Sequence, residues 1–289
     1  MTDKTPPARR GWRIESAYRW CLLLPLVFVA VFFLWPIATV VLRSLTDPVP
    51  GLGNYGRVFG GGPYLRVLWI TMETAAIVTV LCLAISYPVA YVMARTRPTL
   101  FGVMMALVVV SLWTSVVIRS YAWMVVFQRR GVINQALVGS GLFERPVNFI
   151  PGTLAVNVGM VHIMLPFMIL PLLAAMRGID RSLVTAAGVM GASPWMAFRK
   201  VFLPLSLPGV SAGCALVFMM SLGFFITPAL LGGPRHMMAA VLIEQQANQM
   251  LDWGLAAALS TVLLAMTTAI YLVYLRLQRD AGIGGVHGR

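Results

Sequence analysis

The feature that most constrains this chain is a series of six long apolar runs that carry almost no charge. About 20 apolar residues in a helix are enough to cross the ~30 Å of hydrocarbon in a bilayer. Each run reaches that length, and only the third contains a charged residue, Arg119. We therefore predict an all-α, polytopic membrane protein with six transmembrane helices, which cover residues 20–42, 74–94, 100–128, 153–176, 205–231 and 253–275.

The placement of charge predicts the orientation of these helices. Only 11% of residues are charged and the net charge is +13. A basic balance is typical either of nucleic-acid binding or of a membrane protein whose positive loops face the cytoplasm. With the N-terminus inside, 14 Lys and Arg residues lie inside and 7 outside, and no basic face is interleaved with aromatic residues. We predict a multi-pass protein of the bacterial inner (plasma) membrane, with both termini cytoplasmic and no nucleic-acid partner.

The chain divides into a membrane domain and two short tails. The first apolar run is longer than the 7–15 residues of a signal-peptide core and no A-x-A site follows it, so we expect it to stay as a first helix. We predict a basic cytoplasmic tail over 1–19, a membrane domain over 20–275 with a cytoplasmic loop at about 177–204, and a second cytoplasmic tail over 276–289. The outside segments 43–67 and 129–152 are long enough to hold short helices.

Prolines are expected to kink several spans, because each removes a backbone donor and frees a carbonyl. They are Pro88 in the second run, Pro166 and Pro171 in the fourth, and Pro228 in the fifth. Kinked helices suit a transporter that must bend, and they also occur in membrane proteins of other kinds.

The loop between the fourth and fifth runs is expected to form two short helices. Asp180 is a suitable N-cap for the first, which stops at Gly191. Ser193 is a suitable N-cap for the second, with Pro194 at its first position, and this helix runs to about residue 202. Leu203–Pro204 is then expected to redirect the chain into the fifth span.

The side chains of this loop indicate contact with another surface. Small residues dominate the first short helix, and an apolar stripe of Trp195, Phe198 and Phe202 marks the second. Such a stripe favours docking on a partner protein, and the alternative is a helix that lies on the bilayer surface.

The same loop resembles the cytoplasmic EAA signature of binding-protein-dependent ABC importer permeases. Ala186, Ala187 and Gly191 stand in register, followed by Val-Phe-Leu-Pro at 201–204, whereas Thr185 replaces the usual Glu. The resemblance implies the type I ABC importer permease fold, with this loop as the coupling helix that docks on a cytoplasmic ABC ATPase dimer. It assigns coupling to Thr185, Ala186, Ala187, Gly191, Ala192, Ser193, Phe198, Leu203 and Pro204.

The chain lacks the G-x-x-x-x-G-K-[ST] run of a P-loop. We therefore expect no cofactor in this chain, and the resemblance places ATP and Mg on the partner ATPase. Three cysteines (Cys21, Cys82, Cys214) lie in apolar runs without metal-ligand spacing, and the three histidines are scattered. We predict no metal site and no catalytic residues.

A narrower resemblance lies in the second and third runs and the loop that follows. The stretches 87–95 (YPVAYVMAR), 118–124 (IRSYAWM), 131–134 (GVIN) and 141–144 (GLFE) look like spermidine/putrescine-type permeases. That resemblance implies a heterodimer with a second permease subunit and delivery by a periplasmic substrate-binding protein. It implies as solute a polyamine or a related cationic or amino compound.

Five residues are expected to line a weak solute path: Glu73, Tyr121, Trp123, Gly223 and Pro228. A carboxylate within a span attracts an ammonium group, although Glu73 could equally pair with Arg66 or Arg119. The aromatic residues could bind a cation or belong to the interfacial belt. Arg119 is expected to be an anchor or gate, and the cavity to lie between two permeases, formed by the second, third and fifth spans.

Two other functions are weighed against this hypothesis. A secondary transporter not driven by ATP would need paired broken helices in inverted repeats, and none is evident. A membrane enzyme would need convergent reactive side chains, which are few in this sequence. The secondary transporter is the alternative that the sequence leaves open.

Overall fold

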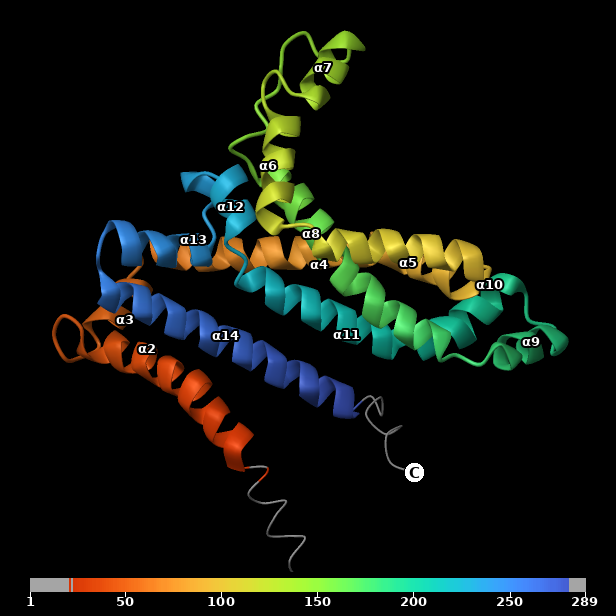
Figure 1. Cartoon of the computed structure of the whole chain (residues 1–289), viewed down its shortest axis with the longest axis horizontal. Coiled ribbons are helices and arrows are strands. Elements are labelled where there is room, and N and C mark those ends of the chain that lie inside the picture. Colours follow the sequence, from red (N-terminus) through yellow and green to blue (C-terminus); the bar gives the residue numbers. More distant parts are fainter. Residues whose placement is uncertain (1–20, 22, 281–289) are drawn as a thin grey trace, which may run out of the picture.

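The computed structural model describes residues 21 and 23–280, and every regular element in this part of the chain is helical. The predicted tail 1–19 and the end of the second tail, 281–289, lie outside it. The α-helices are α2 Trp35–Thr46, α3 Gly53–Phe59, α4 Pro63–Arg95, α5 Pro98–Trp113, α6 Val116–Phe127, α7 Val132–Gly139, α8 Thr153–Arg177, α9 Arg181–Val189, α10 Pro194–Ala197, α11 Leu203–Leu222, α12 Ile226–Leu231, α13 Ala239–Glu244 and α14 Trp253–Asp280 (Figure 1). Short π- and 3-10 turns are η1 Ala30–Leu34, η2 Phe198–Phe202, η3 Pro234–His236 and η4 Gln245–Gln249.

Five helices of the described chain are long and apolar enough to cross a membrane, and the number is six when one bent helix pair is counted as a span. The five are Leu23–Thr46, Pro63–Arg95, Thr153–Arg177, Pro194–Leu222 and Trp253–Arg276. Six spans and an all-α fold confirm the predicted class. Several bounds differ from the predicted ones. Helix α4 begins 11 residues before the predicted run, which was limited to uncharged residues and so excluded Arg66 and Glu73. Helix α14 continues past residue 275 to Asp280.

The third span is not the single straight helix that the sequence predicts. Pro98–Trp113 and Val116–Gly139 meet at an angle of 96°. The break falls at Thr114 and Ser115, whose backbone is extended. The Thr114 hydroxyl donates to the carbonyl of Val110 at 3.0 Å, so it competes with the helical backbone where the helix stops. The α6–α7 arm therefore projects from the body (Figure 1).

The fifth span also differs from its prediction, at both ends. Leu203–Pro204 does not redirect the chain, because one continuous helix runs from Pro194 to Leu222. The π-turn η2 precedes Pro204, and in it the N–H of Leu203 donates to the carbonyl of Phe198, five residues back. This wider turn lets the helix continue past Pro204, which has no backbone N–H to donate. At the other end α11 stops at Leu222, and Pro228 lies in the separate helix α12.

The core forms where α4, α8 and α11 pack together. Four α8 side chains are fully buried there: Met160, Met164, Met168 and Leu172. Gly209 and Gly213 of α11 lie one turn apart against α8, and a Cβ on Gly213 would sit 2.7 Å from the sulfur of Met168. Small residues at this spacing let two membrane helices approach closely. The Gly-x-x-x-Gly contact therefore sets the distance between the fourth and fifth spans.

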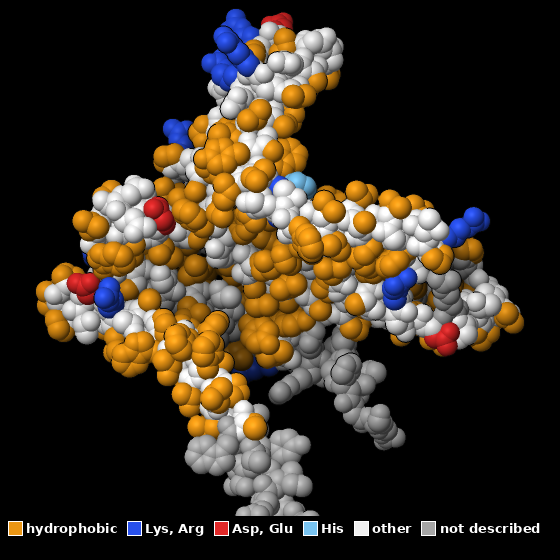
Figure 2. Space-filling view, viewed as in Figure 1, with side chains coloured by type: hydrophobic (Ala, Val, Ile, Leu, Met, Phe, Trp, Pro, Cys, Tyr) orange, Lys and Arg blue, Asp and Glu red, His pale blue; other side chains and the backbone are white. Residues whose placement is uncertain are grey.

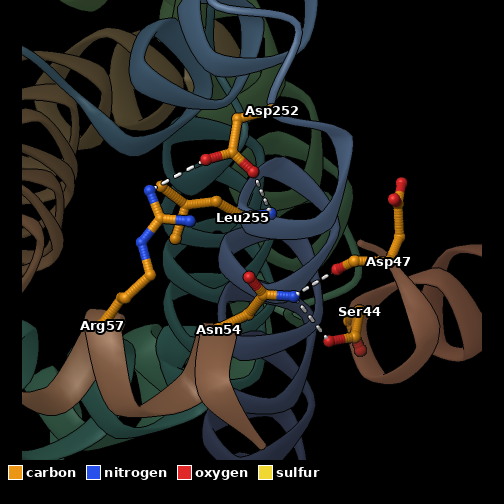
Figure 3. A network of polar contacts seen from close by, with 6 residues as sticks. All are labelled: Ser44, Asp47, Asn54, Arg57, Asp252 and Leu255. Carbon is orange, nitrogen blue, oxygen red and sulfur yellow. Dashed lines mark hydrogen bonds and ion pairs between the residues drawn. The ribbon is translucent and has the colours of Figure 1, made fainter. Parts of the chain in front are cut away.

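A second cluster joins α3, α4, α13 and α14 at the opposite end from α9 and α10 (Figure 1). Figure 3 shows its polar clasp, centred on buried Asn54. The Asn54 amide donates to the carbonyls of Ser44 and Asp47, at 3.1 and 2.8 Å. Asp252 accepts from the N–H of Leu255 at 3.1 Å. The first two bonds close the α2–α3 connection, and the third caps the start of α14.

The clasp also contains an ion pair. Asp252 lies 2.8 Å from the guanidinium of Arg57, and this carboxylate raises the pKa of Arg57. Figure 2 shows hydrophobic side chains spread over the flanks of the body, whereas Lys and Arg side chains gather at its ends and at the tip of the arm. This distribution is typical of a protein whose flanks face lipid.

Candidate functional site

The loop between the fourth and fifth spans begins with a capped helix, α9. The N–H of Ser182 donates to the Asp180 carboxylate at 2.9 Å, and this bond lowers the pKa of Asp180. At the other end Gly191 has φ +88°, in the left-handed region. The N–H groups of Gly191 and Ala192 donate to the carbonyls of Gly188 and Ala187, both at 3.0 Å. This pair of bonds is a Schellman motif, so the predicted cap and stop are confirmed.

The second helix of the loop starts at the predicted cap. The N–H of Met196 donates to the hydroxyl of Ser193 at 3.3 Å, and Pro194 occupies the first helical position. From there the chain continues through η2 into α11 without a break. The second half of the loop and the fifth span are therefore one continuous helix.

The outer surface of the loop consists of small and apolar side chains. Val189 is 84% exposed, Met190 82% and Trp195 69%. Thr185 and Ala186 also face outward, whereas Ala187 is buried. We name the exposed surface of Leu183, Val189, Met190, Trp195 and Met196 the loop tip. No other part of the described chain covers this tip. An exposed apolar surface of this kind is typical of a site that docks on a partner.

The predicted apolar stripe does not point outward as one surface. Phe198 is half-buried and Phe202 is buried, and both rings meet Tyr91 of α4 edge-on, at 5.7 and 5.1 Å between centroids. The Tyr87 ring also meets Phe198, at 6.3 Å, and its hydroxyl lies 2.9 Å from that of Ser206. The prediction was wrong for Phe198 and Phe202, because a neighbouring span of the same chain covers them.

The nine residues assigned to coupling thus separate into two groups. Four face outward on the loop: Thr185, Ala186, Gly191 and Ser193. The others form the base of the loop or the start of the span: Ala187, Ala192, Phe198, Leu203 and Pro204. Sequence reasoning missed Tyr87, Tyr91 and Arg95, which receive the loop on α4. Their spacing of four residues places them on one helical face and was the available signal.

The five residues assigned to a solute path do not come together in one cavity. Glu73 is exposed on α4, and Tyr121 is exposed on α6. Trp123 turns inward, stacks on Phe127 and donates to Nδ1 of His162 at 3.1 Å. Gly223 lies at the break after α11, and Pro228 is buried in α12.

The charged residues near this path are not paired with each other. Arg57–Asp252 is the ion pair recorded within the described residues, so the alternative that Glu73 pairs with Arg66 or Arg119 does not hold there. Arg119 is 7% exposed, and its Nε has no partner. One of its terminal nitrogens lies 3.5 Å from the Ser111 hydroxyl, across the bend of the third span. No three His, Cys, Asp or Glu side chains in the described chain gather as a metal site.

Comparison with known proteins agrees with this geometry. Residues 86–281 match the family described as binding-protein-dependent transport system inner membrane component, which is more than half of the chain. The spermidine/putrescine transport system permease protein PotB of Haemophilus influenzae is 31% identical over 86% of this chain and 92% of its own length. PotB of Escherichia coli K12 is 32% identical over 82% of this chain and 86% of its own length.

Solved structures share the fold. A chain of a bacterial ABC transporter involved in the import of the acidic polysaccharide alginate superposes with a TM-score of 0.74 at 18% identity, covering 94% of this chain and 99% of that one. A chain of the MetNI methionine ABC transporter superposes at 0.58 and 20% identity, over 75% and 95%. The two PotB relatives are transport system permeases, and together with the family match they remove the alternative of an ATP-independent secondary transporter. The chain therefore belongs to the family of binding-protein-dependent transport system inner membrane components, as a membrane permease of an ABC importer for a small solute, and it is not an enzyme.

Proposed function

We propose that this permease forms half of a solute path with a second permease subunit, and that it imports a polyamine or a related cationic amino compound. A periplasmic binding protein delivers the solute. The loop tip docks on a cytoplasmic ABC ATPase dimer, which binds ATP and Mg. Both termini and the loop then lie on the cytoplasmic side, and the α3 clasp and the α6–α7 arm lie outside.

One observation carries this proposal: Trp195 and Met196 of the uncovered loop tip lie in the same continuous helix as the fifth span. The base of that helix is held to α4 by the contacts of Phe198 and Phe202 with Tyr91. Aromatic pairs of this kind each contribute about 0.5–1.5 kcal/mol beyond the area they bury. A push on the tip would therefore move the second and fifth spans together, as rigid-body coupling requires.

Two observations support a cationic solute. The relatives at 31–32% identity are named for spermidine and putrescine transport. In addition, Glu73 is the one acidic residue within the six spans, and it is exposed on α4. An exposed carboxylate at membrane depth is costly unless it meets a cation, a partner chain or water. The interface with a second permease would supply that setting.

The docking is tested with two matched variants of the assembled complex. Ala186→Arg places a long charged side chain on the outward face of α9, whereas Val132→Arg places it on α7, where Val132 is 66% exposed. Ala186→Arg should lose the ATPase during affinity purification, and Val132→Arg should keep it. A cysteine at Val189 should also cross-link to the ATPase in a background without native cysteines. Normal assembly and uptake in Ala186→Arg would contradict the docking.

The solute is tested by uptake of labelled spermidine and putrescine into proteoliposomes. Uptake should require ATP on the loop side and the loaded binding protein on the other side. Glu73→Gln should raise the KM for polyamine, and Glu73→Asp should restore it, because only the charge is needed. Efficient uptake without the binding protein, or an unchanged KM in Glu73→Gln, would count against this part of the proposal.

A further inference from the structure

A cavity of about 570 Å³ lies beneath the coupling loop, where the ends of α4 and α8 meet α9 and η2. Its wall includes Arg95, Arg177, Ile179, Val184, Thr185 and Phe202. Four other cavities of the described chain have no charged residue in their walls. A volume of this size is in the range of pockets that hold small ligands. This cavity therefore differs from the other four in the charge of its wall.

Aromatic rings hold both guanidinium groups of this cavity in place. The central carbon of the Arg95 guanidinium lies 4.1 Å from the ring centroid of Tyr91 and 4.9 Å from that of Phe202. The corresponding carbon of Arg177 lies 3.7 Å from the ring centroid of Phe101. Stacking uses the flat face of a guanidinium and leaves the N–H groups at its edge free to bind a planar or tetrahedral anion. The two side chains are thus held before any ligand arrives.

The described segments around the cavity supply no free carboxylate to neutralise these two charges. Asp180 is the single acidic residue in the segments 94–101 and 176–204 that surround the cavity. Its carboxylate is already bound to the N–H of Ser182, as the N-cap of α9. The ion pair of the described residues joins Arg57 of α3 to Asp252, just before α14, and α3 lies at the opposite end of the molecule from α9 (Figure 1). Two like charges that line one cavity repel each other, and a bound anion relieves that repulsion.

We propose that this cavity binds a phosphate-bearing anion, which Arg95 and Arg177 hold together. Arginine forks match phosphate oxygens in bidentate geometry, which favours phosphate over a halide. Basic pockets between membrane helices at the cytoplasmic surface are suited to anionic lipid headgroups, and a free phosphate would meet the same donors. Bound there, the anion bridges the end of α4, the end of α8 and the base of the coupling loop.

The position of the cavity gives the ligand an effect on coupling. Val184 and Thr185 contribute the α9 wall, and Arg95 and Arg177 contribute the walls from two spans. A ligand that touches all three walls stiffens the joint between the loop and the membrane. This consequence rests on the proposed docking of the loop, whereas the binding itself does not.

The binding is measured on the assembled permease–ATPase complex in detergent, with two probes. Native mass spectrometry counts adducts of phosphatidylglycerol, with phosphatidylcholine for comparison, and a thermal-shift assay titrates inorganic phosphate. The test variant is Arg95→Gln with Arg177→Gln. The matched control is Arg97→Gln, because Arg97 is exposed at the same end but lies outside the cavity wall. None of these readings requires transport, so a failure here is distinct from a failure of the proposed function.

The wild type and the control should bind the same probe with equal affinity, and the double variant should bind it at least about tenfold more weakly. Phosphatidylglycerol adducts alone identify a lipid headgroup, and a phosphate-dependent shift identifies a free anion. Equal binding of both probes by the double variant and the wild type would overturn the proposal. If the double Gln variant does not assemble, Arg95→Lys with Arg177→Lys keeps the charge and loses the fork. Undiminished binding by that variant would overturn the proposal equally.

Discussion

Gly191 is the residue at which backbone conformation most directly controls the loop between the fourth and fifth spans. Its φ of +88° closes the Schellman turn at the end of α9. A residue with a Cβ pays about 1–2 kcal/mol to adopt that region, which is a factor of about 5–30 in the population of the turn. No atom lies within 4 Å of a Cβ built at this position, so a clash within the chain adds nothing to this conformational cost.

The loop has little packing with which to resist this strain. Among the α9 side chains that the structure describes, residues 182–189, Val184 is half-buried, Ala187 is buried and the others are exposed. Gly191→Ala should therefore open the turn by the full 5–30-fold factor estimated above, while the rest of the molecule keeps its midpoint of thermal unfolding. ATP-driven uptake and binding-protein-stimulated ATP hydrolysis should both fall, because the loop tip no longer holds one shape.

A series of side chains at this position separates backbone strain from contact with the ATPase. Asn tolerates the left-handed region better than Ala, although Asn is larger. Uptake should therefore decrease in the order Gly, Asn, Ala, Val if the turn matters, as measured in proteoliposomes containing equal amounts of complex. If uptake instead decreases in the order Gly, Ala, Asn, Val, the size of the side chain at its contact with the ATPase determines uptake. That result would refute the reasoning from the Schellman turn.

Three further predictions concern the packing around the loop and the clasp. In Gly213→Val the new side chain should press on the sulfur of Met168, force α8 and α11 apart and lower the free energy of unfolding by about 1–3 kcal/mol, as measured by thermal unfolding. Gly223→Ala is the control and should leave the stability unchanged, because no atom lies within 4 Å of a Cβ built at Gly223. Tyr91→Leu should remove the edge contacts with the coupling helix and lower uptake per ATP hydrolysed, and unchanged coupling would reject the transmission route through α4. Asn54→Leu should leave two carbonyls without their donor and cost about 1–3 kcal/mol, read as faster proteolysis of the α2–α3 connection.

Local features of the loop were predictable because local chemistry sets them. Asp180 and Ser193 cap helices with their own neighbours, and Gly191 stops α9 through its own backbone freedom. None of these needs a distant residue. The direction of the Phe198 and Phe202 rings was not predictable in this way, because it depends on Tyr91, which lies more than 100 residues earlier in the chain. A sequence pattern shows that a face is apolar and does not show which neighbour covers it.

The sequence by itself determined that this chain spans a membrane six times, since the length and apolar content of each run leave lipid as the only solvent that suits it. It also determined the shape of the loop between the fourth and fifth spans, through two N-caps and a glycine. Tertiary structure alone decided the 96° bend of the third span, the continuous helix through Pro204, and the meeting of Arg95 and Arg177 in one cavity. Each of these depends on which helices pack side by side, and packing joins residues whose separation along the chain carries no local signal.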